Sequence, residues 1–316
     1  MKYSNQTKPV LAFAMALAGV IFFSSKAVFV KMAYKYEVDA LSLLTLRLLF
    51  AFPVYLGVFI GASTKGKLSE FKGREYLKLI LLGIVGYYLA SLFDFSGLKY
   101  ITASLERLIL FIYPTMVLAI SALVLKQKIS TEQKIAVVIT YLGVMLAFYQ
   151  NSYSGGSNFW LGALLIFSSA LMYAIYLVGT GNIISRFGTK LFTSFVMIVS
   201  SLACFLHFII SAKLGLFNFQ IEVYLLAFAM SILCTVIPSF LISEAIRRIG
   251  APNVAIIGSV GPISTIILAT LFLGERISVF QLLGTIVVIS GVLMLAINKN
   301  SKPNSNVALA KQKLKD

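Results

Sequence analysis

The sequence predicts an all-α integral membrane protein whose ten transmembrane helices form two inverted five-helix repeats. The chain has 316 residues, of which 59% are hydrophobic and 12% charged, whereas a soluble domain needs more charge to cover its surface. Apolar runs of about 20 residues, the length that crosses a bilayer core of about 30 Å, follow one another along the chain. Similar segments recur 148 residues apart, which indicates that the fold is built twice.

The apolar runs define the expected spans in order. They lie at residues 10–33, 40–62, 77–98, 102–125, 133–149, 159–182, 190–212, 223–246, 251–273 and 279–298. We expect no signal peptide before the first span, because its apolar run is long and no cleavage site of small residues follows it.

The repeat follows from matching residues in the two halves. The same offset of 148 separates Pro114 from Pro262, and Leu125–Ser130 (LKQKIS) from Leu273–Ser278 (LGERIS). Each half holds five spans, and an odd number makes the second copy enter the membrane upside down relative to the first.

We therefore divide the chain into five parts. They are a cytoplasmic N-terminus (1–9), a first repeat (10–150), a linker rich in turn-forming residues (151–158), a second repeat (159–298) and a disordered basic cytoplasmic tail (299–316).

Lys and Arg outside the spans are unevenly distributed. One set of connecting segments, together with both ends of the chain, carries fourteen of them, and the opposite set carries four, at Lys35, Lys99, Lys213 and Arg276. Cytoplasmic segments of membrane proteins are enriched in Lys and Arg. We therefore expect both termini in the cytoplasm and a multi-pass protein of a bacterial inner membrane. The same placement explains the net charge of +16 without a nucleic-acid partner.

Residues that would hold a metal or a cofactor are scarce. The two cysteines, Cys204 and Cys234, fall inside expected spans and lack metal-ligand spacing, and His207 is the single histidine. We expect His207 to be packed or hydrogen-bonded rather than to relay protons. No HExxH motif, GxSxG motif or pair of catalytic carboxylates indicates an enzyme. The sequence predicts no metal, no cofactor and no catalytic residue.

This layout resembles the drug/metabolite transporter superfamily, specifically its EamA-type ten-helix members. The resemblance covers about Val10 to Asn298 and rests on Phe22–Ala33 (FFSSKAVFVKMA), Leu44–Leu56 (LTLRLLFAFPVYL), Pro114, Pro262, Leu271–Ser278 (LFLGERIS) and Gly284–Leu295 (GTIVVISGVLML). The first repeat departs from the family pattern, since Lys126-Gln127 stands where the second repeat has Gly274-Glu275. The resemblance implies export of amino acids or related compounds from the cytoplasm, with or without proton coupling.

We expect two charges to lie inside the membrane. The uncharged stretch Leu79–Phe93 has 15 residues, or roughly 22 Å of helix, which is too short to cross the bilayer. The span therefore continues past Asp94 to Lys99, and the same reasoning places Lys26 inside the first span. Both residues precede the outer end of a helix by five positions, so they lie at similar depth and are able to form an ion pair. The alternative is that Lys26 extends to the lipid headgroups and Asp94 is a solvated helix end.

Other charges lie beside longer apolar runs. For Arg47, Glu106 and Arg107, and for the charges of 244–248 and 275–276, we favour a place at the membrane interface. Arg47, Glu106 and Arg107 are nonetheless candidates for a charged site with Lys26 and Asp94. Their slight cationic excess favours a zwitterion or an anion as solute. A coupled proton would be carried by Asp94 or Glu106, because a carboxyl group removed from water holds a proton more readily.

The second half contributes aromatic and backbone features. At the 148 offset Ile242 matches Asp94, so we expect a one-sided site whose far wall holds Tyr173, Tyr176 and Asn182. These side chains suit a small organic solute with apolar and polar parts. Pro114 and Pro262 interrupt equivalent helices, which is typical of transporter sites, although a simple packing kink is the alternative.

The combined interpretation is a secondary transporter of small organic metabolites in a lipid bilayer. Alternating access between the two inverted repeats would move the solute. The alternative is a flippase for lipids or lipid-linked carriers, or a subunit of a membrane assembly. Both a monomer and a dimer are compatible with the sequence.

Overall fold

The computed structural model describes residues 7–63, 73–124, 126, 129–149, 158–180, 183, 187–211, 215–249, 254, 257–258 and 260–300. All regular secondary structure within these ranges is helical. The helices are α1 (Thr7–Ser24), α2 (Lys26–Tyr34), α3 (Ala40–Ser63), α4 (Gly73–Gly83), η2 (Ile84–Leu89), α5 (Ala90–Gly97), α6 (Ala103–Leu110), α7 (Tyr113–Val124), α8 (Thr131–Phe148), α10 (Phe159–Thr180), α12 (Thr189–Ile210), α13 (Ile221–Ser231), η3 (Ile232–Val236), α14 (Ile237–Ile249), α16 (Val260–Leu273) and α17 (Val279–Asn300).

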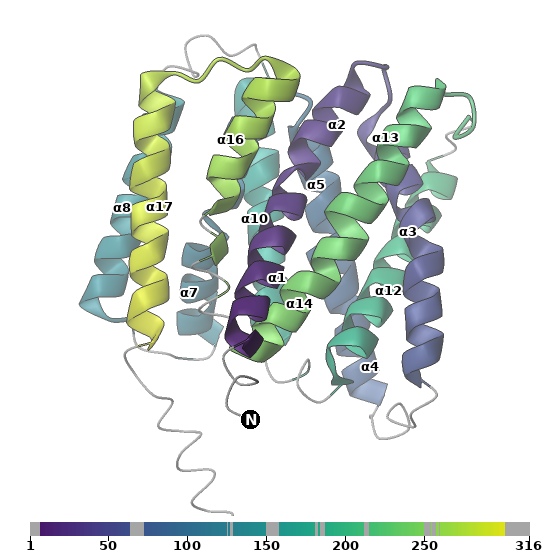
Figure 1. Cartoon of the computed structure of the whole chain (residues 1–316), viewed down its shortest axis with the longest axis horizontal. Coiled ribbons are helices and arrows are strands. Elements are labelled where there is room, and N and C mark those ends of the chain that lie inside the picture. Colours follow the sequence, from purple (N-terminus) through teal and green to yellow (C-terminus); the bar gives the residue numbers. More distant parts are fainter. Residues whose placement is uncertain are drawn as a thin grey trace, which may run out of the picture.

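These helices join end to end into ten rods, and each rod overlaps one of the ten expected spans. Eight of the rods are long and apolar enough to cross a membrane, and two shorter apolar helices, Val260–Leu273 and Val279–Met294, complete the set within the described residues. Figure 1 shows the rods standing side by side, with α8 and α17 at one end of the molecule and α3 and α12 at the other. The predicted ten-helix membrane fold is confirmed.

Local capping explains where several rods begin. Asp39 Oδ1 accepts hydrogen bonds from the backbone N–H groups of Leu41 and Ser42 ahead of α3. Thr102 accepts from Leu105 N at the start of α6, and Ser130 and Gln133 form a reciprocal capping box at the start of α8. Each side chain satisfies a backbone donor that has no partner within its own helix.

Helix pairing follows the two-fold relation of inverted repeats. The second helix of one repeat packs on the second of the other, α3 on α12, and the fifth packs on the fifth, α8 on α17. The first helix of each repeat packs on the third helix of the other, as α1 does on α14 and α10 does on α5. These exchanged contacts are what an inverted duplication requires.

The third rod of each repeat contains a π-helical turn at the same place. The turn η2 begins at Ile84 and η3 begins at Ile232, which are 148 residues apart. A π-helical turn inserts one residue into an α-helix and is frequent at functional sites. Sequence reasoning did not predict either turn.

Small residues bring helix backbones together. A Cβ atom at Gly143 of α8 would lie 2.7 Å from Val288 N of α17, and one at Gly284 would lie 2.6 Å from Ala147 N. The two helices therefore touch along their backbones. Gly258 differs from these glycines, because a Cβ atom there would meet nothing within 4 Å.

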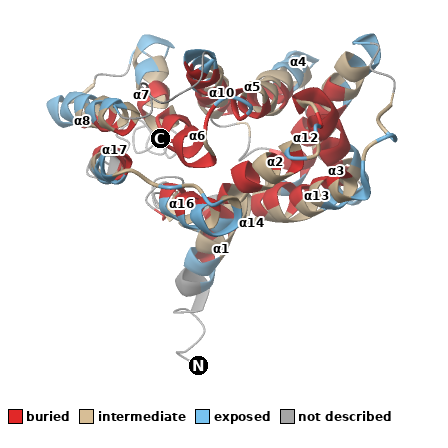
Figure 2. Cartoon of the chain, turned by 90° about the horizontal axis from the view of Figure 1, so that it is seen from above, coloured by how far each residue is buried: buried red, intermediate tan, exposed pale blue. Residues whose placement is uncertain are grey.

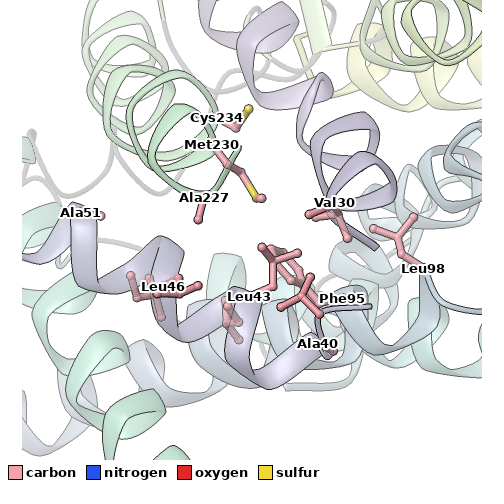
Figure 3. Packing of buried hydrophobic residues seen from close by; sticks show 14 of the residues in the cluster. Val30, Ala40, Leu43, Leu46, Ala51, Phe95, Leu98, Ala227, Met230 and Cys234 are labelled. Atoms are coloured by element: carbon pink, nitrogen blue, oxygen red, sulfur yellow. The ribbon is translucent and has the colours of Figure 1, made fainter. Parts of the chain in front are cut away.

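Buried residues face the inside of the helix bundle and exposed apolar residues face outward (Figure 2). The largest buried apolar cluster joins α2, α3, α5, α12 and α13. Figure 3 shows Val30, Leu43, Phe95 and Met230, from four of these helices, around one shared interior region. The charged site lies on the helices that build this cluster and on α6.

Candidate functional site

Five charged side chains of the first repeat are buried in the protein. Lys26 of α2 is 6% exposed, Arg47 of α3 is 3%, Asp94 of α5 is 1%, Glu106 of α6 is 0% and Arg107 of α6 is 8%. The interfacial depth favoured for Arg47, Glu106 and Arg107 stays a prediction, but their side chains are enclosed by protein and not by solvent. The run-length argument treats each helix alone and misses that neighbouring helices enclose these residues.

Lys26 holds the two carboxylates together. Its Nζ atom lies 2.5 Å from Asp94 Oδ2 and 3.8 Å from Glu106 Oε1. The pairing of Lys26 with Asp94 follows from their similar depth in two helices that run in the same direction. Within the described part of the chain, Asp94 Oδ1 and Glu106 Oε2 have no hydrogen-bond partner, so carboxylate oxygens remain free in a buried place.

A break in the first rod sets the position of Lys26. Ser24 donates its hydroxyl hydrogen to Val20 O at 2.6 Å, and Ser25 donates to Phe22 O at 2.7 Å. Serine hydroxyls that bond back to the preceding turn bend a helix. The helix α1 ends at Ser24, and α2 restarts at Lys26, which places the amine at the bend.

Arg107 extends the cluster towards α16 of the second repeat. Its Nη2 atom donates to Ser24 Oγ at 3.0 Å. The guanidinium carbon and Lys26 Nζ each lie 5.3 Å from the centroid of the Phe23 ring, a distance at which cations attract an aromatic ring. A Cβ atom at Gly261 would lie 2.7 Å from Arg107 Nη2, so glycine at this position leaves room for the guanidinium.

Arg47 reaches the second repeat separately. Its Nε atom donates to Thr235 Oγ1 at 2.7 Å, and its guanidinium carbon lies 5.4 Å from the centroid of the Phe95 ring. Thr235 belongs to η3 and donates its hydroxyl hydrogen to Met230 O, five residues earlier. The π-helical turn therefore turns a threonine hydroxyl towards Arg47.

The predicted aromatic wall is a ladder of tyrosines. Tyr173 and Tyr176 of α10 stack with ring centroids 5.9 Å apart. Tyr113 meets Tyr173 edge to face at 5.2 Å, and Tyr87 meets Tyr176 at 5.1 Å. Sequence reasoning missed Tyr87 and Tyr113, and their positions beside Gly86 and Pro114 were the available signal. Asn182 lies outside the described residues.

The two prolines sit in the first turns of helices. Pro114 is the second residue of α7, directly after the break at 111–112 that separates α7 from α6. Pro262 is the third residue of α16. Proline is well tolerated in a first turn, where its missing N–H would have no partner within the helix.

Glu275 is a residue whose role sequence reasoning missed. Its Oε1 atom accepts from Ala103 N at 2.8 Å, and Oε2 accepts from Ser104 N at 3.2 Å and from Ser104 Oγ at 2.7 Å. This carboxylate from the loop after α16 caps the N-terminus of α6, the helix that carries Glu106 and Arg107. Ala103 and Ser104 are 172 and 171 residues away from Glu275 in the sequence, so no local sequence pattern predicts the contact.

The remaining charges lie nearer the surface, as expected. Arg248 and Glu244 form an ion pair one helical turn apart, and Arg276 is exposed. The side chain of Arg247 lies outside the described residues. His207 is hydrogen-bonded, with its Nδ1 atom 2.5 Å from the Tyr88 hydroxyl.

The second repeat has apolar residues at the places that match the charged cluster. At the 148 offset, Ala174 matches Lys26, Phe195 matches Arg47, Ile242 matches Asp94 and Val254 matches Glu106. The two repeats share a fold, but only the first repeat carries the charged residues of the cluster. The predicted one-sidedness of the cluster follows from this difference.

Comparison with known proteins places the chain in a family. The sequence pattern of the EamA-like transporter family matches residues 10–149 and, a second time, residues 160–297. The chain belongs to the EamA-like transporter family. A double match over two five-helix halves accords with the ten-helix fold built from two repeats. The protein is therefore a multi-pass membrane protein with a general transporter function.

Relatives of this EamA-like protein carry the same general description. It is 31% identical to the uncharacterized transporter YcbK of Bacillus subtilis over 85% of this chain and 87% of that protein. It is 27% identical to the uncharacterized transporter YyaM of the same organism, over 73% and 76% of the two chains. A solved crystal structure superposes with a TM-score of 0.64 at 15% identity, covering 90% of this chain and 95% of the other, which shows the shared fold.

Proposed function

We propose that this EamA-like protein exports small organic metabolites, with amino acids as the leading class, by alternating access between its two repeats. The observation that carries the proposal is the buried cluster of Lys26, Asp94 and Glu106 where helices of the two repeats meet. Charges inside a membrane protein are costly and mark solute or ion pathways. The cationic and anionic groups of a zwitterionic solute would pair with the carboxylates and the amine of this cluster in place of their pairing with one another.

The transport step would move one repeat against the other. The exchanged packing of α1 on α14 and of α10 on α5 gives two equivalent hinge regions, each beside a π-helical turn. Rocking about such a two-fold relation opens the centre to one side of the membrane and then to the other. The termini, in our proposal, face the cytoplasm of a bacterial cell and the protein lies in its inner membrane.

A proton is the coupling ion that suits the cluster. Lys26 faces two carboxylates, and a single amine cannot neutralise both. In our proposal, Asp94 or Glu106 takes up a proton when the solute leaves and releases it when a solute amine arrives. The pH gradient would then drive export.

The test is counterflow in liposomes that contain the pure protein, with labelled amino acids and related zwitterions as solutes. We expect saturable exchange by the wild type. Asp94→Asn and Lys26→Ala should lower exchange at least about tenfold, because each removes a charged group that would bind the solute, and a hydrogen bond to a charged group contributes about 1.5–3 kcal/mol. Lys35→Ala and Glu37→Gln, at exposed positions after α2, are the matched controls and should exchange normally.

Each outcome has a definite meaning. If both cluster variants still exchange solute, the protein is a transporter but the cluster is not its solute-binding site. Absence of exchange with every solute would favour the lipid flippase or assembly subunit instead. A pH gradient should accelerate flux in the wild type and fail to do so in Glu106→Gln or Asp94→Asn if these carboxyls couple the proton.

A further inference from the structure

Arg47 is a buried cation without a counter-ion. It is 3% exposed, and across the described residues no carboxylate lies within ion-pair distance of it. The nearest acidic residue along α5 is Asp94, which is engaged by Lys26. The Nη1 atom of Arg47 is buried and has no hydrogen-bond partner.

The neighbours of Arg47 compensate only part of its charge. The Phe95 ring attracts the guanidinium by about 2 kcal/mol when water is excluded, and Thr235 accepts one hydrogen bond from Nε. Removing an arginine from water inside a membrane protein is itself costly. The arrangement lacks an anion.

Polar groups around Arg47 are held in place by the π-helical turn η3. The Tyr55 hydroxyl lies 2.9 Å from Ser239 Oγ and donates to Thr235 O at 3.3 Å. Thr235 Oγ1 accepts from Nε, while Nη1 is a buried donor without a partner. A planar guanidinium with free donors suits the two oxygens of a carboxylate.

We propose that Arg47 binds the carboxylate of the transported solute, with Thr235 orienting the guanidinium, while Asp94 and Glu106 take the solute amine. This assignment rests on the proposed function and narrows the substrate to compounds that carry both groups. Phe95 links the proposed carboxylate-binding residue, Arg47, to a proposed amine-binding residue, Asp94. Its ring lies against Arg47, and it directly follows Asp94 in the sequence.

Arg107 is less suited to this role. Its guanidinium shares the Phe23 ring with the Lys26 amine and adjoins Glu106 in α6, so it lies beside the carboxylates of the cluster. Arg47 lies against the Phe95 ring, and within the described chain no carboxylate is within ion-pair distance of it. The anionic end of a solute is therefore drawn to Arg47.

The experiment measures thermal unfolding of the pure full-length protein in detergent, which needs no transport. Each labelled amino acid of the counterflow panel is compared with its decarboxylated amine and with sodium chloride alone. A ligand that binds the folded state at 100 times its Kd raises the unfolding midpoint by several °C. We expect the amino acid to raise the midpoint and the matching amine to bind about 100-fold more weakly or more.

Variants assign the effect to Arg47. Arg47→Gln should remove the difference between amino acid and amine, while Arg47→Lys keeps the charge and should lose most of the bidentate preference. Thr235→Val, which is closely isosteric, should weaken amino acid binding several-fold and serves as the second variant if Arg47→Gln fails to fold. Arg276→Gln, at an exposed position, should leave binding unchanged.

Three results would overturn the assignment. One is stabilisation by chloride alone to the same extent, which would make the ligand an inorganic anion. Another is equal binding of amino acid and amine by the wild type, or no binding of either. The third is an undiminished preference in Arg47→Lys and Thr235→Val. Counterflow that persists in these cases would leave the proposed function intact, so the two failures are distinguishable.

Discussion

Lys26 is one amine shared by two buried carboxylates. The effect of a substitution on stability therefore depends on whether it removes the amine or one of the carboxylates. The amine is 2.5 Å from Asp94 Oδ2 and 3.8 Å from Glu106 Oε1. Removal of Lys26 leaves two like charges in an apolar place, where each is costly. Removal of Glu106 alone leaves Lys26 paired with Asp94. The cluster should therefore tolerate the loss of one carboxylate better than the loss of the amine.

A double-mutant cycle tests this dependence. We expect Lys26→Met to lower the free energy of unfolding by about 3–5 kcal/mol. Glu106→Gln should restore part of that loss in the double variant, with a coupling energy of about 1–3 kcal/mol. Chemical unfolding in mixed micelles measures the three variants against wild type. Additive effects would mean that Glu106 does not share the Lys26 amine.

The charged residues of the cluster could be found from the sequence, and their polar partners could not. A charge stands out against apolar runs, and the length of the runs places Lys26 and Asp94 inside the membrane. Thr235 and Ser24 give no such signal, because hydroxyl side chains are common in membrane helices and bond to their own backbone. Arg47 was found as a charge, but its lack of a counter-ion depends on which helices surround it.

At the scale of elements, α6 is held at its N-terminus by the loop between α16 and α17. The Glu275 carboxylate accepts three hydrogen bonds from Ala103 and Ser104. A carboxylate at a helix N-terminus satisfies free backbone donors and also opposes the positive end of the helix dipole. The position of Glu106 and Arg107 therefore depends on a residue of the other repeat.

Substitution of this cap should weaken the fold measurably. We expect Glu275→Ala to lower the free energy of unfolding by about 1–2 kcal/mol and the unfolding midpoint by a few °C. Arg276→Ala, the exposed neighbour, is the control and should change neither. An unchanged midpoint in Glu275→Ala would show that the cap contributes nothing to stability.

The turn η2 depends on close packing against α10. A Cβ atom at Gly86 would overlap the Tyr176 side chain, whereas one at Gly57 of α3 would meet nothing within 4 Å. We expect Gly86→Ala to destabilise the protein by about 1–3 kcal/mol through overpacking. Gly57→Ala should be neutral or slightly stabilising, because alanine favours helix. Thermal unfolding of both variants gives the comparison, and equal midpoints would contradict the contact.

The rods and an interruption near Pro114 were predictable, and the two π-helical turns were not. Span length, apolar composition and the caps at 39, 102 and 130 are local properties that the sequence displays. The π-helical turns have the sequences IVGYYL and ILCTV, which an α-helix would accept equally well. Their presence depends on packing between helices, such as that of Gly86 on Tyr176.

For the whole molecule, the inverted repeats and the distribution of Lys and Arg predict one orientation in the membrane. Alkaline phosphatase fused after Lys99 should be active, because we expect this turn outside the cytoplasm. The same enzyme fused after Arg74 should be inactive, and a fluorescent protein fused after Asp316 should fluoresce. The reverse pattern would reject cytoplasmic termini.

The matched π-helical turns also carry a historical consequence. A one-residue insertion at Ile84 and again 148 residues later, at Ile232, is accounted for by a single event that preceded gene duplication. A five-helix ancestor that already had this turn in its third helix would account for both positions. Lys26 and Asp94, matched by Ala174 and Ile242, mark what changed once the two copies were free to diverge.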